Sequence, residues 1–359
     1  MTAFRWIGPE HSLDVPEGTP LHRGTLAEAG AWLPALEAEL RARSGLRVAG
    51  GLPFHAEDPV RLHLTRAEWR ASPPVSGPVG TTLVDSWTRA PADAAYEAGV
   101  RAALDTFATG ELEKVVLARA LELEEVVSDP LAFAEALRAD NPNARIYALK
   151  LEAERWLVGA SPELLLSRRG HRVESLPLAG SMPRGQTREE DAANAARLEG
   201  SAKDRHEHAL VAEHIEATLR PFCHTLTLSS QVVRTSSMLH LGTRIVGELK
   251  RPVSSLELAV ALHPTPAVCG VPVEPARAFI RDHEALDRGM YAGLVGSMEA
   301  SGDGDWWVAL RCAEIGPRST KLIAGAGIVP GSDPSAERIE THAKMKTVAR
   351  ALARCRASA

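Results

Sequence analysis

The chain has 359 residues, of which 45% are hydrophobic and 24% are charged, with a net charge of −5 at pH 7. This balance indicates a folded globular protein and excludes a disordered or fibrous chain. No run of about 18 apolar residues and no basic block with interleaved aromatic residues is present, which excludes a membrane span and a nucleic-acid partner. Without a secretory leader or paired cysteine motifs, we expect a cytoplasmic protein with a small-molecule partner.

The first eighty or so residues carry few motif-like features and end in the stretch SPPVSGPVGTT. A segment rich in proline and glycine suits a connection between substructures. We therefore expect an N-terminal part, residues 1–85, and a catalytic part, residues 90–355, joined in one compact unit.

From residue 91 onward the sequence predicts helices alternating with strands. The run ADAAYEAGVRAALDTFATG predicts a helix that ends at a glycine, and KVVLARALEL predicts the strand that follows. Further strands are predicted at residues 144–151, 155–160, 164–168, 171–180, and 305–315, the last forming a hairpin with 321–329 through the turn GPRS. Further helices are predicted at residues 130–139, 202–220, 275–283 and 336–355. Hairpins separated by single helices indicate an α+β fold with mainly antiparallel sheets.

Two of the predicted helices carry carboxylates three residues apart. Asp204 and Glu207 form one pair, and Glu337 and Glu340 form the other. Residues at this spacing share a helix face, so each pair offers oxygen ligands to a hard cation such as Mg²⁺. A solvated helix face gives the same pattern, and a single pair favours that simpler explanation.

The segment AGAGIVPGSDP gives the second pair a special position. A strand with Gly325 and Gly327 runs into a helix that Ser332 or Asp333 can cap, with Pro334 in the first turn. Backbone N–H groups and a helix N-terminus meet there, and such a place binds anions. The spacing differs from the GxGxxG of a dinucleotide site.

Two single residues are also candidates for chemistry. Lys114 begins a strand and is either a desolvated base or an ordinary strand-end lysine. Glu163 follows an apolar strand in GASPE and is either a surface turn residue or an acid in a cleft. The HEH cluster is not a zinc-protease motif, because Leu210 stands where that motif needs a histidine.

A series of motifs between about residues 110 and 345 resembles that of the chorismate-utilising enzymes, and it follows the order of that family. The motifs are EKVVLAR, GASPELLL, PLAGSMPRG, SAKDRHEHALV, LHLGT, LHPTPAVCG, LDRGMYAGLVG, VALRCAEI and AGAGIVPGSDPSAERIET. The family includes isochorismate, salicylate, anthranilate and aminodeoxychorismate synthases. The resemblance implies a large two-sheet α/β sandwich with an active-site cleft between its halves, Mg²⁺ as cofactor, and chorismate as substrate.

The resemblance also implies the acid and the base. Lys114 of KVVLAR would activate the nucleophile, and Glu163 of SPE would protonate the departing hydroxyl group. Water is a poor nucleophile at pH 7 and hydroxide a poor leaving group, so the substitution needs both groups. These roles require a neutral Lys114 and a protonated Glu163.

The carboxylate pairs match the family's metal site. By resemblance, Glu207 and Glu340 would bind Mg²⁺, and Glu337 and Asp204 would reach the ion directly or through water. Mg²⁺ there would neutralise the ring carboxylate of chorismate.

The enolpyruvyl carboxylate has a matching pair of its own. Arg311 of VALRC and Tyr291 of MYAG occupy the family's binding positions, and an arginine fork suits a carboxylate. Other positions expected to line the pocket are Gly180, Ser181, His240, Gly325, Gly327 and Lys344.

Two alanines suggest the branch of the family. Ala179 stands where aminodeoxychorismate synthases carry a nucleophilic lysine, and Ala267 stands where anthranilate and salicylate synthases usually carry a threonine. We therefore expect water addition to give isochorismate without loss of pyruvate, an isomerase reaction, as in siderophore and menaquinone routes. Ser181 replaces the family's usual threonine but keeps the hydroxyl. Salicylate synthase and a non-catalytic or partner-dependent subunit remain the alternatives, and we expect a monomer.

Overall fold

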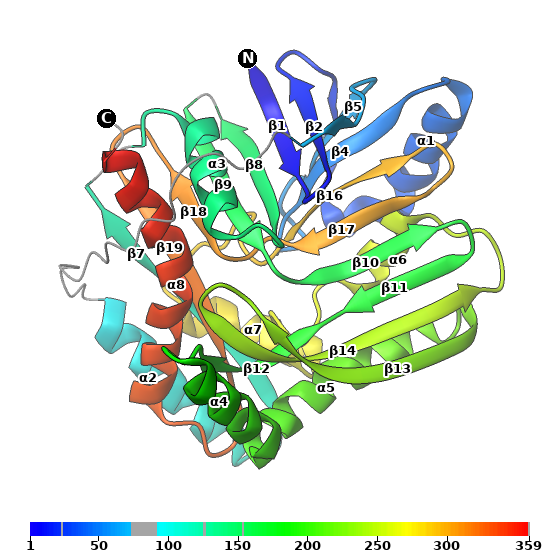
Figure 1. The fold of residues 1–359 in the computed structure, drawn as a ribbon. Helices are drawn as coiled ribbons and strands as arrows, with labels where there is room; N and C mark the ends of the chain where they lie inside the picture. Colours follow the sequence, from blue (N-terminus) through cyan, green and yellow to red (C-terminus); the bar gives the residue numbers. More distant parts are fainter. Residues whose placement is uncertain (23, 73–91, 125–126, 153, 358–359) are drawn as a thin grey trace.

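The structure is a computed structural model. It describes the chain except for residues 23, 73–91, 125–126, 153 and 358–359. The predicted boundary near residue 85 and nearly all of the proline- and glycine-rich stretch lie outside the described residues. The described residues form two large antiparallel sheets with helices on their outer sides (Figure 1).

The first sheet has nine strands among the described residues, and all of its pairings are antiparallel. In spatial order they are β15 (Gly270–Val271), β7 (Lys114–Leu123), β19 (Thr320–Ile328), β18 (Cys312–Ile315), β9 (Arg155–Ser161), β8 (Arg145–Glu152), β1 (Thr2–Ile7), β2 (His11–Pro16) and β6 (Arg70–Ala71).

The second sheet has ten strands in the described part of the chain, again paired antiparallel. In spatial order they are β12 (Leu178–Pro183), β14 (Met238–Leu249), β11 (Arg172–Leu176), β10 (Leu164–Arg169), β17 (Gly304–Val308), β16 (Leu294–Glu299), β4 (Arg47–Leu52), β5 (Arg61–Thr65) and β3 (Leu21–His22), while β13 (Cys223–Arg234) also pairs with β14.

The helices cover the outer faces of both sheets. They are α1 (Ala29–Ala42), α2 (Ala92–Phe107), α3 (Pro130–Asp140), α4 (Arg188–Gly200), α5 (Ala202–Leu219), α6 (Ser255–Leu262), α7 (Val273–His283) and α8 (Pro334–Ala357), with a 3₁₀ turn η1 (Leu26–Glu28) before α1. Helices α3 and α8 pack on the first sheet, and α4, α5 and α6 pack on the second. The expected α+β fold with mainly antiparallel sheets is confirmed.

The main core includes residues from both sheets and from the N-terminal strands. Phe4, Val48, Leu149, Leu294 and Trp306 are fully buried in it. A large side chain of this kind contributes about 1.5–3 kcal/mol when buried. Because β1 and β2 belong to the first sheet and β4 and β5 to the second, the described residues before position 73 contribute to both halves of the fold.

Two strand predictions differ from the structure. Residues 305–315 do not form one strand, because the chain leaves the second sheet after β17 and enters the first sheet at β18. Between them Arg311 has a positive φ of 51°, which a strand cannot accommodate. Residues 171–180 form two strands, β11 and β12, on either side of Pro177. The other predicted strands and helices are present within a few residues of their expected limits.

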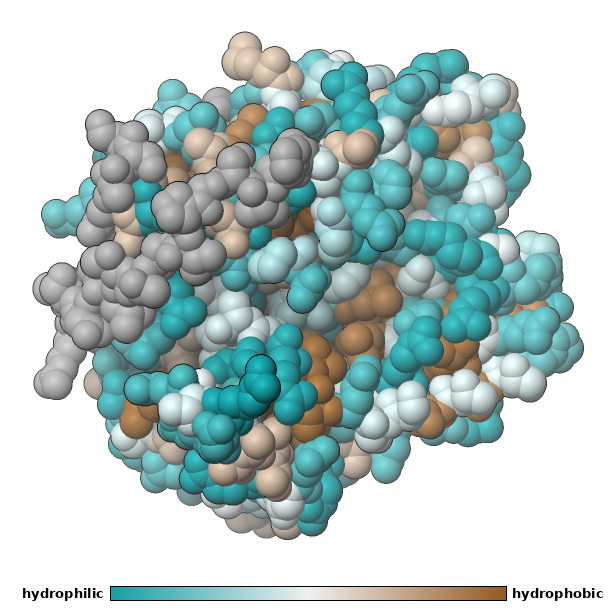
Figure 2. Space-filling model, in the orientation of Figure 1, coloured by the Kyte–Doolittle hydropathy of each residue, from teal (hydrophilic) through white to brown (hydrophobic). Residues whose placement is uncertain are grey.

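The surface shown in Figure 2 is largely hydrophilic, with a smaller apolar area near the middle of the view. A hydrophilic area lies over α4, whose first turn holds Glu189, Glu190 and Asp191. Among the described helices, none combines the length and the apolar composition needed to span a bilayer.

Candidate active site

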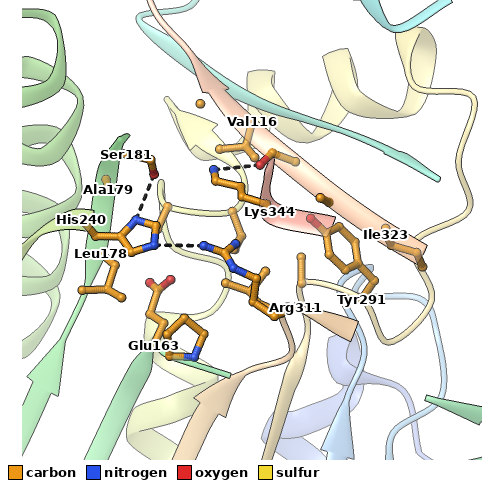
Figure 3. A pocket seen from close by; sticks show the side chains of 18 of the residues that line it. Val116, Glu163, Leu178, Ala179, Ser181, His240, Tyr291, Arg311, Ile323 and Lys344 are labelled. Carbon is orange, nitrogen blue, oxygen red and sulfur yellow. Dashed lines mark hydrogen bonds between the residues drawn. The ribbon is translucent and has the colours of Figure 1, made fainter. Parts of the chain in front are cut away.

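A narrow pocket, with about 50 Å³ of space open to a water-sized molecule, lies where strands of both sheets meet α5 and α8. Strands β7 and β19 of the first sheet form one side, and β12 and β14 of the second form another. Figure 3 shows that Glu163, His240, Arg311, Lys344 and Tyr291 point toward this common space. The predicted residues that line it are Glu163, Gly180, Ser181, Glu207, His240, Ala267, Tyr291, Arg311, Gly325, Gly327 and Lys344.

Glu163 is a buried carboxylic acid that faces the pocket. It lies two residues after the end of β9, and only 3% of its surface is exposed. Burial raises its pKa from 4.5 to about 7, against the opposing effects of the Leu178 N–H group and of the nearby cations Lys114, Arg311 and Lys344. Glu163 is therefore substantially protonated near neutral pH, which fits the requirement for a general acid. The alternative of a surface turn residue is wrong for this position.

Ser181, His240 and Arg311 form a chain of hydrogen bonds along one wall (Figure 3). A guanidinium group only donates, so Arg311 Nη2 donates to His240 Nε2 at 2.9 Å. Burial, Arg311 and Lys344 hold the pKa of His240 well below its ordinary value. His240 is thus neutral with its proton on Nδ1, which lies 2.9 Å from Ser181 Oγ. The Ser181 hydroxyl proton is left for another acceptor.

Arg311 owes its place in the pocket to the crossing between the two sheets. Two hydrogen bonds fix this crossing: Tyr147 Oη donates to the Leu310 carbonyl at 3.0 Å, and Ala160 N–H donates to the Arg311 carbonyl at 3.1 Å. His240 is the one side chain in the described residues to which the guanidinium hydrogen-bonds. Its other N–H groups suit a ligand carboxylate.

Lys114 is fully buried at the start of β7 and faces a carboxylate of α5. Its Nζ lies 3.1 Å from Glu207 Oε1, which is ion-pair distance, and has no well-directed hydrogen bond within the described residues. Burial alone would raise the pKa of Glu207, but Lys114, Lys344 and Lys203 outweigh burial and lower it. The neutral amine required of a base stays a prediction.

Gly327 leaves the room that this ion pair occupies. A Cβ atom at Gly327 would lie 2.0 Å from Glu207 Oε1 and 3.2 Å from Lys114 Cε. Any side chain there would push the two groups apart. On the same strand, the Gly325 carbonyl accepts a hydrogen bond from Lys344 Nζ at 3.0 Å.

The two carboxylates of α8 are also held by lysines. Glu337 is 2% exposed and forms a close ion pair with Lys203 of α5, while Glu340 Oε1 lies 2.6 Å from Lys344 Nζ. Burial and the neighbouring Glu340 raise the pKa of Glu337, in spite of Lys203. Asp333 Oδ1 accepts the Ala336 N–H at 2.8 Å, which confirms the expected helix start.

Asp204 lies at the edge of this region. A Cβ atom at Gly180, whose φ is +69°, would lie 3.3 Å from Asp204 Oδ1. No ion pair or side-chain hydrogen bond of its carboxylate occurs among the described residues.

The carboxylates are compatible with Mg²⁺ but do not form a ready cluster. In the part of the chain that the structure describes, no three acidic, histidine or cysteine side chains converge closely enough to hold a metal. Mg²⁺ commonly uses only one or two protein carboxylates and takes its other ligands from water and substrate. Glu207, facing the Cβ-free space at Gly327, and Glu340 could supply such a pair.

The remaining pocket wall was not predicted. It consists mainly of apolar side chains and backbone without a sequence signature: Val116, Pro162, Leu178, Val268, Ala292, Leu310, Ile323 and Ala324. Ala179, used above to choose the branch, also lines the pocket.

A buried ion pair next to the pocket was also not predicted from the sequence. Arg288 and Glu284 are joined by hydrogen bonds of 2.6 and 2.7 Å. Arg288 also donates to the carbonyls of Val116 and Val268, and Glu284 accepts the Ala118 N–H. The pair thus fastens β7 to the segment that carries Ala267. The sequence held one indication of this pair, because Arg288 of the motif LDRGMYAG lies four residues after Glu284.

The histidines of the HEH cluster differ in environment. His208 is buried, its Nε2 lies 2.7 Å from Thr243 Oγ1, and burial lowers its pKa to about 4. His206 is exposed.

Comparison with known proteins relates this site to one family. Residues 71–353 match the family model described as chorismate binding enzyme. The chain is 42% identical to the vibriobactin-specific isochorismate synthase of Vibrio cholerae over 83% of its own length and 77% of the relative's. It is 47% identical to the isochorismate synthase DhbC of Bacillus subtilis, over 72% of its own length and 67% of the relative's. The crystal structure of DhbC from Bacillus anthracis superposes with a TM-score of 0.89, at 38% identity, covering 98% of this chain and 96% of that one. The chain belongs to the chorismate-binding enzyme family.

Proposed function

We propose that this protein is an isochorismate synthase, an isomerase that converts chorismate to isochorismate with Mg²⁺ as cofactor. The observation that carries the proposal is Glu163, a buried acid with a pKa of about 7 that faces a pocket lined by Arg311, Tyr291 and His240. The names of the relatives reported above agree with this choice.

The substrate is a dicarboxylate, and the pocket offers cations to it. Arg311, with N–H groups beyond the one given to His240, would bind the enolpyruvyl carboxylate, and Tyr291 lies on the same side. Glu207 and Glu340 would hold Mg²⁺, with Glu337 and Asp204 near it. When bound, Mg²⁺ supplies positive charge for the ring carboxylate.

The reaction replaces one hydroxyl group by another. Lys114 Nζ would take a proton from the attacking water as the new C–O bond forms at C2. Glu163 would give its proton to the C4 hydroxyl group, which leaves as water. One water enters and one leaves, and the pair is reset when Lys114 returns its proton and Glu163 regains one.

The shape of the pocket favours water as the nucleophile. Ala179 and Ala267 line it, and neither side chain carries an amine or hydroxyl group that could attack or activate the ring. The Ser181 hydroxyl, aligned by neutral His240, could hold the water or a substrate hydroxyl by a hydrogen bond.

The test is the product formed from chorismate by the purified protein. With Mg²⁺ we expect isochorismate alone, detected by chromatography. A chelator should abolish it, and excess Mg²⁺ should restore it. Salicylate with pyruvate would identify a salicylate synthase instead, and no turnover would indicate a non-catalytic or partner-dependent subunit.

A further inference from the structure

Lys203 lies among the carboxylates to which the proposed function assigns the metal. It stands in the first turn of α5, directly before Asp204, and forms its close ion pair with Glu337 of α8. Its Nζ atom therefore lies against one of the carboxylates of the proposed metal site, where α5 and α8 face each other.

The three lysines of this region differ in their access to water. The side chain of Lys114 is 0% exposed, that of Lys344 is 11% exposed, and that of Lys203 is 35% exposed. Lysine has a flexible four-carbon stem and a strongly hydrated head group. Lys203 can therefore move its ammonium group into solvent without opening the core, whereas Lys114 cannot.

Movement of Lys203 would help the carboxylate cluster to accept a metal ion. Glu207, Glu337 and Glu340 each lie within ion-pair distance of a lysine. A buried carboxylate without such a partner is strongly destabilised. A divalent cation that enters this cluster would take over the role of partner and add positive charge beside the lysines. Releasing the most exposed of them relieves that repulsion and frees an oxygen of Glu337.

We propose that Lys203 is a removable counter-ion, which neutralises the carboxylate cluster in the metal-free protein and competes with the divalent cation for Glu337. This inference rests on the metal site of the proposed function. It assigns to Lys203 a role in setting metal affinity, distinct from that of any metal ligand or catalytic group.

The test is direct titration of the metal-free protein with MgCl₂ by isothermal calorimetry, without substrate. Lys203→Met, which removes the competing charge, is expected to tighten the Kd for Mg²⁺ by about tenfold. The metal-free variant should also melt at a lower temperature than the wild type, and Mg²⁺ should raise its Tm by more.

Lys150→Met is the matched control, because Lys150 forms a similarly close and partly exposed ion pair with Glu17 outside the pocket. Its Kd for Mg²⁺ should equal that of the wild type. Circular dichroism checks the fold, and Lys203→Gln serves as a second neutral variant with the same expected change.

Equal or weaker Mg²⁺ binding by both Lys203 variants would overturn the inference, even if the wild type makes isochorismate. Absence of Mg²⁺ binding by every form would overturn the metal site and the inference together. Tighter binding by the variants in a protein that does not convert chorismate would support Lys203 as counter-ion and reject the proposed reaction.

Discussion

Two buried carboxylates on different sides of the pocket have pKa values that are shifted in opposite directions. Glu163 and Glu207 are similarly enclosed, at 3% and 8% exposure, and burial is the largest influence on the pKa of each. Yet the pKa of Glu163 rises to about 7, whereas that of Glu207 falls. Glu207 Oε1 lies at ion-pair distance, 3.1 Å, from Lys114 Nζ, and Glu163 has no ion-pair partner among the described residues. Close cations, rather than burial, therefore decide which of the two carboxylates keeps its proton near neutral pH.

The largest expected effect is on turnover when either proposed proton-transfer group is removed. Lys114→Ala and Glu163→Gln should each lower kcat by at least about 10²-fold, because each loses a general base or acid. Steady-state rates of isochorismate formation measure this loss, with circular dichroism as the check on folding. Near-normal turnover in either variant would mean that its role has been assigned to the wrong residue.

The next effect is on stability when the charged side of the pocket loses its anion. Glu207→Ala leaves the fully buried Lys114 without its ion-pair partner, which should lower the free energy of unfolding by about 3–5 kcal/mol. Urea denaturation measures the change. Glu340→Ala is the control with a smaller expected loss, because Lys344 still donates to the Gly325 carbonyl.

The same Glu207→Ala variant should need far more Mg²⁺ for half-maximal turnover, since it lacks a proposed ligand. The variant's Mg²⁺ titration should shift strongly to higher concentration. An unchanged Mg²⁺ titration would place the metal at other residues.

Replacing Glu163 should increase stability, whereas replacing Glu207 should decrease it. Folded Glu163 keeps a proton that the unfolded chain loses above pH 4.5, so its contribution to stability declines as pH rises from 4.5 to about 7. Glu163→Gln removes this cost and should raise the free energy of unfolding by about 1–3 kcal/mol above pH 7. Near pH 4 the gain should vanish. Urea denaturation at both pH values tests this, and a loss of stability at pH 8 would contradict it.

A smaller effect is expected from pH on the wild-type enzyme. With a pKa of about 7, the protonated fraction of Glu163 falls about tenfold between pH 6 and pH 8. If Glu163 is the general acid, kcat/KM should decrease over the same range. A profile of kcat/KM against pH, at saturating Mg²⁺, would show a decline with a midpoint near 7. A flat profile from pH 6 to pH 9 would show that Glu163 does not act as the acid.

Most of the site could be predicted because its residues lie in motifs that resemble those of the family. Local periodicity and turn chemistry predicted strand β7, the turn after β9 and helix α5, whereas the resemblance singled out Lys114, Glu163 and Glu207. The break at Arg311 could not be predicted, because VALRC is apolar and β-branched like a strand. Its left-handed backbone is stabilised by contacts with Tyr147 and Ala160, which are more than 140 residues away in the chain.

The sequence by itself determined the α+β class, the family resemblance and the set of acidic, basic and arginine side chains. Periodicity is a local property, and the order of motifs can be read along the chain without knowing the fold. The tertiary structure decided how strongly the two buried glutamates, Glu163 and Glu207, hold a proton. Glu163 and Glu207 are the same residue type in equally suggestive motifs. Their different pKa values depend on which cations the two sheets and α8 bring within a few ångströms, and such long-range electrostatic contacts have no local signature in the chain.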